Sequence, residues 1–376
     1  MSRYAFLILP SHNRVYADTA PALARAELAV LSAALPDAEI DEESVAETVI
    51  GGVPYVAFEA GELSQRDADV LANLSSLYAL FEIAGGELPR PVLQPVPLRR
   101  LDRFDDDLLT ILKYPGKTNE QFTKLLLNVT LASSDFAGSD YALSDVADGP
   151  GSRRLAVLDP LCGRGTTLNQ ALMYGFDAYG ADVDARDVEA YAVFIQRWLK
   201  DKRLKHQADF SPVRRDRKVV ARRLTAQFAA TKDEYKVGDV QRLEVVETDT
   251  TRVGEYFRAA SADLVVADLP YGVQHGSHVG GRASAGSRAG AGGGRALARS
   301  PLDLLREAAP AWVKALRPGG ALGISWNTLV ARREDAAAAL VAAGLEVLDS
   351  GPYRAFRHRV DQAITRDILV ARKPAR

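Results

Sequence analysis

Asp159, Gly163, Gly165 and Asp182 have the types and spacing of a nucleoside-binding site. Gly163 and Gly165 allow the backbone to turn tightly and let a ligand approach it closely, because neither residue carries a Cβ. Asp182 lies roughly 20 residues beyond the turn, where a carboxylate can accept hydrogen bonds from ribose hydroxyls. The group therefore predicts a site for a nucleotide or nucleoside cofactor.

The same turn favours a cationic cofactor over one that carries a pyrophosphate. The dinucleotide fingerprint GxGxxG needs a third glycine, and Leu168 occupies that position. Asp159 at the mouth of the turn would repel a pyrophosphate and attract a cation. These residues favour S-adenosylmethionine over NAD, with a purely structural glycine turn as the alternative.

The tetrapeptide Asp268-Leu269-Pro270-Tyr271 is a second group of residues whose types could support a reaction. Asp268 and a neighbouring backbone carbonyl can accept both hydrogens of a planar exocyclic amine, and Pro270 fixes the backbone that presents the carbonyl. Tyr271 can stack on the ring that bears the amine. An amine held in this way directs its lone pair at a methyl donor, so the transfer depends on positioning more than on acid–base catalysis.

Short apolar runs place both groups on an open α/β sheet. Residues 156–158, 178–181 and 264–267 have the composition of buried parallel strands, and a helix over 167–175 connects the first two. Ligands of such sheets bind at the carboxyl ends of the strands. A further strand over 237–246 leads to Asp249. The carboxylate of Asp249 could accept a hydrogen bond from the exocyclic amine of adenine, and a plain turn at the end of the strand is an equal alternative.

The order LDPLCGRGTTL, GADVD, TDT, DLPYG and LRPGG resembles the class I S-adenosylmethionine-dependent methyltransferases that methylate amines, and residues 113–372 fit that pattern. The first and fourth motifs together look most like the RNA guanosine-N2 methyltransferases that act on tRNA. The resemblance implies a Rossmann-like class I methyltransferase sheet, S-adenosylmethionine as cofactor and tRNA as partner. It implies cofactor contacts from Thr118, Asp159, Cys162, Gly163, Gly165, Thr166, Asp182 and Asp249. The target amine would be held by Asp268, Leu269, Pro270 and Tyr271.

Three features bear on that resemblance. Leu269 replaces the first proline of the more frequent DPPY, at a position that contributes backbone. The family usually carries a fuller RNA-binding amino-terminal domain than residues 1–100 supply. Cys162 lies in the cofactor turn, away from the expected base site, so we expect a structural role or a backbone contact rather than the nucleophile of cytosine-C5 methylation.

A chain of 376 residues is long enough for two domains. We expect a small α+β accessory domain over residues 1–100 that would position RNA, a linker and helix over 101–150 that lead into the cofactor site, and the methyltransferase domain over 151–376. The first domain should contain a helix over 19–35 with Pro21 in its first turn. A second helix should begin after Ser64 and carry the apolar face Leu71, Leu74, Leu77 and Leu80. A proline-rich linker is expected over 89–97.

The stretch Gly116-Lys117-Thr118 resembles the end of a phosphate-binding P-loop, but the glycine required five residues earlier is Ile111. We expect a loop followed by a helix over 119–132, capped by Thr118 or Asn119. In methyltransferase folds a loop at this position touches the cofactor, and a plain structural helix is the equal alternative.

Two other segments have unusual compositions. Residues 273–300 are dominated by Gly, Ser, Ala and Arg, which indicates a flexible loop that is either a substrate lid or a tolerated insertion. A basic segment follows the predicted helix over 188–199 and is either a surface for nucleic-acid phosphates or a solvated helical face. Its cations are Arg197, Lys200, Lys202, Arg203, Lys205, Arg214, Arg215, Arg217, Lys218, Arg222 and Arg223.

Composition narrows the class of protein. The net charge is −2, so no global charge indicates nucleic-acid binding, and a single cysteine fits a reducing compartment. No apolar run is long enough for a membrane span, and His275 and His278 lack a cysteine or carboxylate cluster that would complete a metal site. We expect a cytoplasmic enzyme without a metal, and the oligomeric state stays open.

The leading hypothesis is methylation of an exocyclic amine of a nucleobase in RNA, with guanosine N2 in tRNA as the first candidate. The motif order also permits methylation of adenine N6 or cytosine N4 in DNA. A protein glutamine amide is planar and fits the same tetrapeptide. A binding module without methyl transfer is the non-enzymatic alternative.

Overall fold

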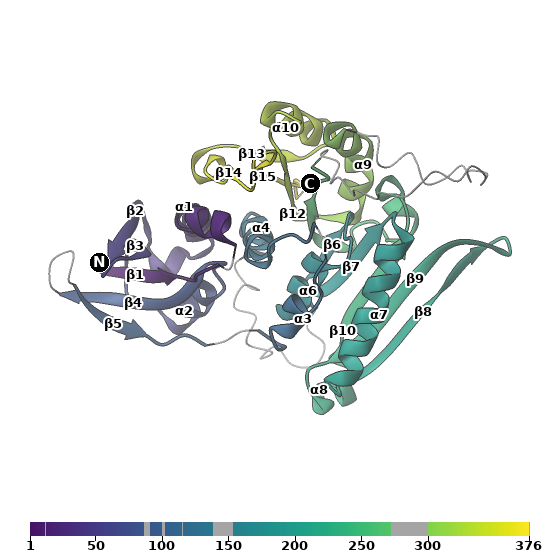
Figure 1. Cartoon of the computed structure of the whole chain (residues 1–376), viewed down its shortest axis with the longest axis horizontal. Coiled ribbons are helices and arrows are strands. Elements are labelled where there is room, and N and C mark those ends of the chain that lie inside the picture. Colours follow the sequence, from purple (N-terminus) through teal and green to yellow (C-terminus); the bar gives the residue numbers. More distant parts are fainter. Residues whose placement is uncertain are drawn as a thin grey trace, which may run out of the picture.

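The computed structural model describes residues 1–11, 13–85, 91–99, 102–114, 116–137, 153–271 and 300–375. Within these residues the chain forms two sheets, which Figure 1 shows on either side of the helices α1 and α4. The amino-terminal sheet is antiparallel with the order β2-β3-β1-β4-β5. The larger sheet has the order β13-β15-β12-β11-β6-β7-β10-β9-β8.

The amino-terminal unit has the β-α-β-β-α-β order of ferredoxin-like domains, extended by the edge strand β5. This is the small α+β unit expected from the sequence. The unit buries Phe6, Leu28 and Phe58 between its sheet and its helices. Its elements are β1 (Ser2–Ile8), α1 (Arg14–Leu31), β2 (Asp41–Ile50), β3 (Val53–Ala60), α2 (Gln65–Ala72), β4 (Leu77–Gly85) and β5 (Val92–Val96).

Three local predictions for this unit are wrong. Helix α1 begins at Arg14 rather than at residue 19, because Asn13 caps it by accepting a hydrogen bond from the Tyr16 amide, and Pro21 lies inside the helix. Helix α2 does start after Ser64 with the expected capping box, but it ends at Ala72. The apolar spacing that suggested a longer helix continues into the strand β4.

The proline-rich stretch expected as a linker contains the strand β5. Pro95 lies opposite Phe81 of β4 in the antiparallel register. An edge strand tolerates proline because one of its sides has no partner that needs an N–H donor. The extension toward the second unit therefore begins after Val96, although the part of residues 89–97 before residue 91 lies outside the described residues.

The larger sheet has the Rossmann-like class I methyltransferase order that the sequence predicts. Strands β6, β7, β10, β11 and β12 pair in parallel, and the antiparallel strand β15 lies between β12 and β13. The short strand β14 pairs with β15. The bounds are β6 (Ala156–Asp159), β7 (Asp177–Asp182), β10 (Gln241–Glu247), β11 (Ala262–Asp268), β12 (Leu316–Asn327), β13 (Glu346–Leu348), β14 (His358–Arg359) and β15 (Thr365–Arg372).

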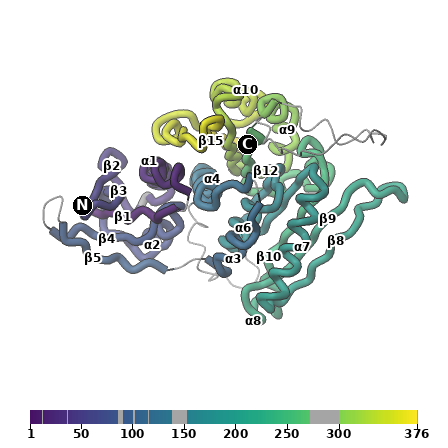
Figure 2. The backbone as a smooth tube through the Cα atoms, in the orientation of Figure 1, coloured from purple at the N-terminus to yellow at the C-terminus, as the bar shows by residue number. Residues whose placement is uncertain are grey.

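Helices cover this sheet and connect it to the first unit. Helix α4 contacts both α6 and β12, and it also packs against α1 of the amino-terminal unit (Figure 2). Asn119 caps α4 as predicted by accepting a hydrogen bond from the Phe122 amide. The bounds are α3 (Asp107–Thr110), α4 (Glu120–Ala132), α6 (Thr166–Met173), α7 (Ala185–Asp201), α8 (Lys232–Val237), α9 (Pro301–Ala315) and α10 (Arg333–Ala342).

A buried polar cluster joins the two units. The carboxylate of Glu27 on α1 accepts hydrogen bonds from the amide and hydroxyl of Ser75 and from the Asn128 amide group on α4. Tyr174 after α6 donates to Asn128 at 2.7 Å. Glu27 and Asn128 are fully buried, and burial raises the pKa of the Glu27 carboxyl. This cluster fixes the position of the amino-terminal unit against the larger sheet.

The basic segment is a hairpin, so the prediction of a helical face is wrong beyond the end of α7. Strand β8 (Lys205–Arg215) and strand β9 (Lys218–Ala229) pair antiparallel, and β9 adds them to the edge of the sheet at β10. Asp216 and Arg217 at the turn have positive φ angles of 48° and 62°, as a two-residue hairpin turn requires.

Candidate functional site

The glycine turn lies at the carboxyl ends of β6 and β7, where the sequence predicts a cofactor. The Gly163 amide donates to one carboxylate oxygen of Asp182 at 2.8 Å, and the Asp184 amide donates to the other at 2.8 Å. The Gly165 amide donates to the Cys162 carbonyl at 2.7 Å and closes the turn. These bonds fix the Asp182 carboxylate beside the glycines and leave its remaining lone pairs available to ligand hydroxyls.

The surroundings of the two glycines differ. Gly165 has φ +81°, and a Cβ there would lie 2.4 Å from the ring of Tyr191 on α7. Gly163 has φ +50°, and a Cβ there would meet no atom within 4 Å. Gly165 is therefore required by packing, whereas Gly163 borders open space that a ligand can enter.

Cys162 is a buried residue of the turn. Its amide donates to the Ala181 carbonyl, and its sulfur lies where a Cβ on Gly180 would approach it to 2.9 Å. Burial is the main cause that raises the pKa of the thiol, which keeps it protonated. The side chain thus has the properties of a packing residue rather than a nucleophile.

The carboxylates of this edge repel one another in a buried setting. Burial is the largest cause that raises the pKa of Asp159 to about 7, and nearby Asp182 and Asp268 raise it further. The pKa of Asp182 is also raised, first by burial and then by Asp187 and Asp184. A cation placed among these groups would favour their ionised forms.

The loop before α4 contacts both groups of predicted site residues. The Tyr114 hydroxyl lies 3.2 Å from the Thr166 hydroxyl at the start of α6, and the Arg164 guanidinium lies over the Tyr114 ring. Thr118, which the sequence assigns to the cofactor, donates its hydroxyl proton to Asp268 at 2.7 Å. The loop therefore connects the glycine turn to the tetrapeptide.

Asp268 is the centre of the second group. Its carboxylate accepts hydrogen bonds from Thr118, from Ser325 at the carboxyl end of β12 and from the Tyr271 hydroxyl. Tyr271 in turn accepts a hydrogen bond from Arg366 on β15, whose guanidinium lies 4.0 Å from the Asp268 carboxylate. Burial raises the pKa of the Tyr271 phenol, so the hydroxyl stays protonated and acts as a donor.

Arg366 is buried between aromatic rings. Its side chain is 5% exposed, and its guanidinium carbon lies 4.2 Å from the centre of the Phe122 ring and 5.0 Å from that of Tyr271. Its Nε has no hydrogen-bond partner among the described residues. This arginine compensates the charge of Asp268 and holds the Tyr271 ring in place.

A backbone hydrogen bond accounts for leucine at position 269, where the motif DPPY has its first proline. The Leu269 amide donates to the Ser325 carbonyl at 2.8 Å, a bond that proline cannot make. The Leu269 side chain is buried in the core, whereas Pro270 is exposed. Leu269 thus extends the pairing of β11 with β12 to the point where the tetrapeptide turns outward.

Asp249 caps a short 3₁₀ helix (Thr250–Glu255) by accepting hydrogen bonds from the Thr251 amide and hydroxyl. It follows β10, the neighbour of the strand that ends in Asp182. Its position fits the sequence expectation of a strand-end carboxylate at the same edge, and the turn role that the sequence left open is also present.

Three residues of the site were missed by sequence reasoning. Tyr114, Ser325 and Arg366 lie far apart in the chain and belong to no motif. Ser325 could have been found, because it lies near the carboxyl end of β12, the apolar parallel strand next to the one that ends in Asp268. Arg366 gave no such signal, since its strand β15 runs antiparallel to β12 and the residue lies in no motif.

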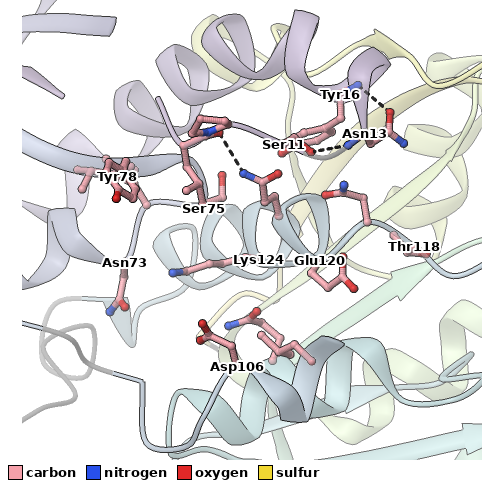
Figure 3. Close-up of a pocket in the computed structure, with 18 of the residues that line it drawn as sticks. Ser11, Asn13, Tyr16, Asn73, Ser75, Tyr78, Asp106, Thr118, Glu120 and Lys124 are labelled. Atoms are coloured by element: carbon pink, nitrogen blue, oxygen red, sulfur yellow. Dashed lines mark hydrogen bonds between the residues drawn. The ribbon is translucent and has the colours of Figure 1, made fainter. Parts of the chain in front are cut away.

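A cleft of about 1040 Å³ lies between the two units and reaches this site (Figure 3). Ser11, Asn13 and Tyr78 of the amino-terminal unit line one side, and Glu120 and Lys124 of α4 line another. Thr118 and Arg366 also line it, so the cleft and the surroundings of Asp268 share two side chains. A ligand that fills the cleft can therefore contact both units.

Two negative findings concern the part of the chain that the structure describes. It contains no group of three His, Cys, Asp or Glu residues that could hold a metal ion. It also contains no helix long and apolar enough to cross a bilayer. Gly272, His275, His278 and nearly all of the loop expected over 273–300 lie outside the described residues.

The chain was compared with known proteins at the levels of sequence and fold. No protein-family model matches the sequence. No curated protein matches it either. Solved structures that it resembles include a TehB-like SAM-dependent methyltransferase from Corynebacterium glutamicum, with 16% identity, a TM-score of 0.30 and coverage of 60% of this chain and 84% of that one.

Two other similar structures are named for different activities. An rRNA methylase from Streptococcus thermophilus has 11% identity and a TM-score of 0.30, with coverage of 59% of this chain and 89% of that one. The N-methyltransferase NodS from Bradyrhizobium japonicum has 13% identity and a TM-score of 0.36, with coverage of 68% and 95%. These values are too low to bear on reaction or substrate, so the strand order and the side chains described above carry the argument.

Proposed function

We propose that this protein is an S-adenosylmethionine-dependent methyltransferase that methylates an exocyclic amine of a nucleobase in RNA, with guanosine N2 in tRNA as the first candidate. One observation carries the proposal. The glycine turn with Asp182 and the Asp268 tetrapeptide lie at one edge of a class I methyltransferase sheet, and a single loop contacts both.

The residues of the glycine turn fit the proposed cofactor. Gly163 borders open space, and the adjacent Asp182 carboxylate can accept hydrogen bonds from ribose hydroxyls. Burial and the neighbouring carboxylates raise the pKa of Asp159 to about 7, and the positively charged groups of S-adenosylmethionine would favour its ionised form. Cys162, Gly165 and Thr166 would shape the turn around the cofactor. Asp249 would accept a hydrogen bond from the adenine amine, and Thr118 would close the site from the loop before α4.

The cofactor supplies an electrophilic methyl group on a sulfonium sulfur. The chain's part is to hold the amine: Asp268 would accept one N–H, and a backbone carbonyl at Leu269 or Pro270 would accept the other. Tyr271 would stack on the base after its hydroxyl leaves Asp268. Attack of the amine nitrogen on the methyl carbon would break the sulfur–carbon bond and leave the cofactor as a neutral thioether. The nitrogen would then lose a proton, for which the Asp268 carboxylate is the acceptor in reach.

A nucleic-acid substrate is supported by the size of the cleft and by the basic hairpin. The cleft of about 1040 Å³ offers more room than one base needs, and it is lined by residues of both units. The amino-terminal unit would then position the RNA, as the sequence suggests. Adenine N6 or cytosine N4 in DNA and a protein glutamine amide present the same planar amine chemistry, so the experiment must separate them.

The test is to incubate the protein with S-adenosylmethionine labelled on the methyl group and, separately, with total tRNA, genomic DNA and a protein extract. Digestion of the labelled pool then identifies the modified residue. Label in N2-methylguanosine from tRNA is the expected result. Label in DNA or in protein alone would reject the RNA substrate, and binding of RNA without any transfer would reject the enzymatic proposal.

A further inference from the structure

The tip of the β8–β9 hairpin, residues 214–220, projects beyond the edge of the sheet that carries the candidate site. Val246 near the end of β10 is paired with Arg223 of β9, and Glu247, the last residue of β10, is paired with Asp182 of β7. The turn at Arg217 lies six residues before Arg223, so an extended hairpin reaches roughly 20 Å past Val246. Both views of the backbone show the tip standing away from the rest of the protein (Figures 1 and 2).

The cations along the hairpin differ in whether they have partners. In the middle of the hairpin, Arg222 pairs with Glu189 and Arg223 pairs with Glu244. Arg215 pairs with Glu255 at 2.7 Å and lies over the Tyr256 ring. Ion pairs therefore neutralise much of the positive charge that the sequence shows in this segment.

Apart from Arg215, the cations of the tip have no acidic partner among the described residues. Every residue from 214 to 220 is exposed, and this stretch contains Arg214, Arg217 and Lys218 in addition to Arg215. None of these three has an acidic partner among the described residues, where Arg214 donates only to the Arg217 carbonyl. Asp216 is the one acidic residue of the stretch. The unpaired positive charge of the hairpin is concentrated at its turn.

The position of this charge favours a polyanion over a small anion. A free nucleoside or an amide side chain at Asp268 could not also reach the tip, whereas a nucleic-acid backbone carries a phosphate at every nucleotide and spans such a distance. The net charge of the chain is −2, so any attraction of an anion must come from a local surface such as this one. The exposed side chains of Val219 and Val220 beside the cations add apolar contact area for sugars or bases.

We propose that the β8–β9 tip binds the phosphate backbone of the nucleic-acid substrate through Arg214, Arg217 and Lys218. The role of this contact in catalysis rests on the proposed function, but the binding itself does not require methyl transfer. The tip holds the polymer at the edge of the sheet, while the Asp268 tetrapeptide selects the base. It should contribute affinity without sequence preference, because phosphates are the same at every nucleotide.

The test compares two double variants with equal loss of charge. Arg217→Gln with Lys218→Gln changes the tip, and Lys232→Gln with Lys236→Gln changes exposed lysines of α8, which follows β9 at the opposite end of the hairpin. Affinity for fluorescently labelled total tRNA is measured by anisotropy at several salt concentrations. The tip variant should bind roughly tenfold more weakly near 0.1 M salt, with a slope of log K against log salt smaller by about 1 to 2.

The control variant should bind like the wild type. Equal binding by the tip variant and the wild type would overturn the inference, and so would an equal loss in the control. Loss of binding to vesicles of anionic phosphatidylglycerol, with tRNA binding unchanged, would identify a membrane surface and also overturn it. Thermal unfolding of each variant verifies the fold, and these exposed positions should shift it little.

Methyl transfer, measured in parallel, separates this inference from the proposed function. If the wild type binds tRNA through the tip but transfers no label to any RNA, the proposed function fails and the binding surface stands. If the wild type methylates tRNA and the tip variant has the same KM and affinity, the surface fails and the proposed function stands.

Discussion

The Tyr271 hydroxyl lies 2.7 and 2.6 Å from the two carboxylate oxygens of Asp268 and donates its proton to them. Thr118 and Ser325 donate to the same carboxylate. Asp268 is therefore surrounded by donors of the protein itself. A substrate amine that binds Asp268 must displace at least one of them, and Tyr271 is the donor that the proposed mechanism moves.

Asp268→Asn should reduce methyl transfer by at least about a hundredfold, because the amide is a weaker acceptor and cannot take up a proton. Binding of S-adenosylmethionine, measured by calorimetry, should stay within about threefold of the wild type, since Asp268 belongs to the amine site. Asp233→Asn is the matched control at a side chain that is 89% exposed. Full activity of Asp268→Asn would contradict the proposed mechanism.

Tyr271→Phe and Tyr271→Ala should have opposite effects on the substrate. The phenylalanine keeps the ring and removes the donor that competes for Asp268, so KM for the nucleic acid should fall by about threefold to tenfold. The alanine removes the stacking surface, so kcat/KM should fall roughly tenfold to hundredfold. Steady-state kinetics distinguish the two, and equal losses in both variants would mean that the hydroxyl itself is required.

Affinity for S-adenosylmethionine should increase as the pH rises from 5 to about 7. Without ligand, burial holds the pKa of Asp159 at about 7, so the carboxyl is mostly protonated at lower pH. A cationic ligand favours the ionised form and lowers that pKa, so binding releases a proton below pH 7 and affinity rises by up to tenfold per pH unit. Calorimetry in buffers with different ionisation enthalpies measures this proton.

Asp159→Asn supplies the control for that pH dependence. The amide cannot titrate, so affinity should be weaker near neutral pH and should change little from pH 5 to 7. Two results would contradict a role of Asp159 in binding the positive charge of the cofactor. One is a wild-type affinity that does not change from pH 5 to 7, and the other is an affinity of Asp159→Asn that still depends on pH.

Gly163→Ala should mainly weaken cofactor binding, whereas Gly165→Ala should mainly lower the stability of the protein. An alanine at 165 meets the Tyr191 ring at 2.4 Å and must hold φ near +81°, so unfolding free energy should fall by at least about 2 kcal/mol. An alanine at 163 meets no atom, and its cost should be about 1 kcal/mol for the positive φ. Gly163→Ala should nevertheless weaken cofactor binding, because the methyl group points into the open space. Urea unfolding and ligand titration check both variants.

Glu27→Ala should destabilise the protein by about 2–4 kcal/mol, because it leaves the buried donors of Ser75 and Asn128 without their acceptor. Glu59→Ala, at an exposed position of the same unit, should change stability by less than about 0.5 kcal/mol. Urea unfolding provides the comparison. Equal stability of the two variants would show that the buried cluster does not hold the units together.

Several elements of the site follow from local sequence. The strands that end in Asp159, Asp182 and Asp268 were predicted at nearly their observed positions, because short apolar runs followed by polar residues indicate buried parallel strands. The cap of α4 at Asn119 and the capping box at Ser64 were also predicted, since each depends on residues three positions apart. Spacing of this kind is a local property, and the sequence carries it directly.

Predictions from local patterns were wrong where the same residue pattern fits both a helix and a strand. Leucines three residues apart suggested one helix, but Ala72 ends α2 and the later leucines lie on β4. Arginine-rich composition suggested a helical face between residues 197 and 223, whereas most of that stretch pairs as β8 and β9. Strand pairing depends on partners that are distant in the chain or across a turn, so composition alone could not decide it.

The sequence by itself determined the strands that end in Asp159, Asp182 and Asp268, the residue types at their carboxyl ends and hence the kind of chemistry that this edge can support. Only the tertiary structure decided which distant residues meet there. Thr118, Ser325 and Arg366 converge on Asp268 and Tyr271 because α4, β12 and β15 pack around the end of β11. The physical reason is that side-chain types and short spacings are encoded locally, whereas a hydrogen-bonded site depends on long-range packing that no local pattern records.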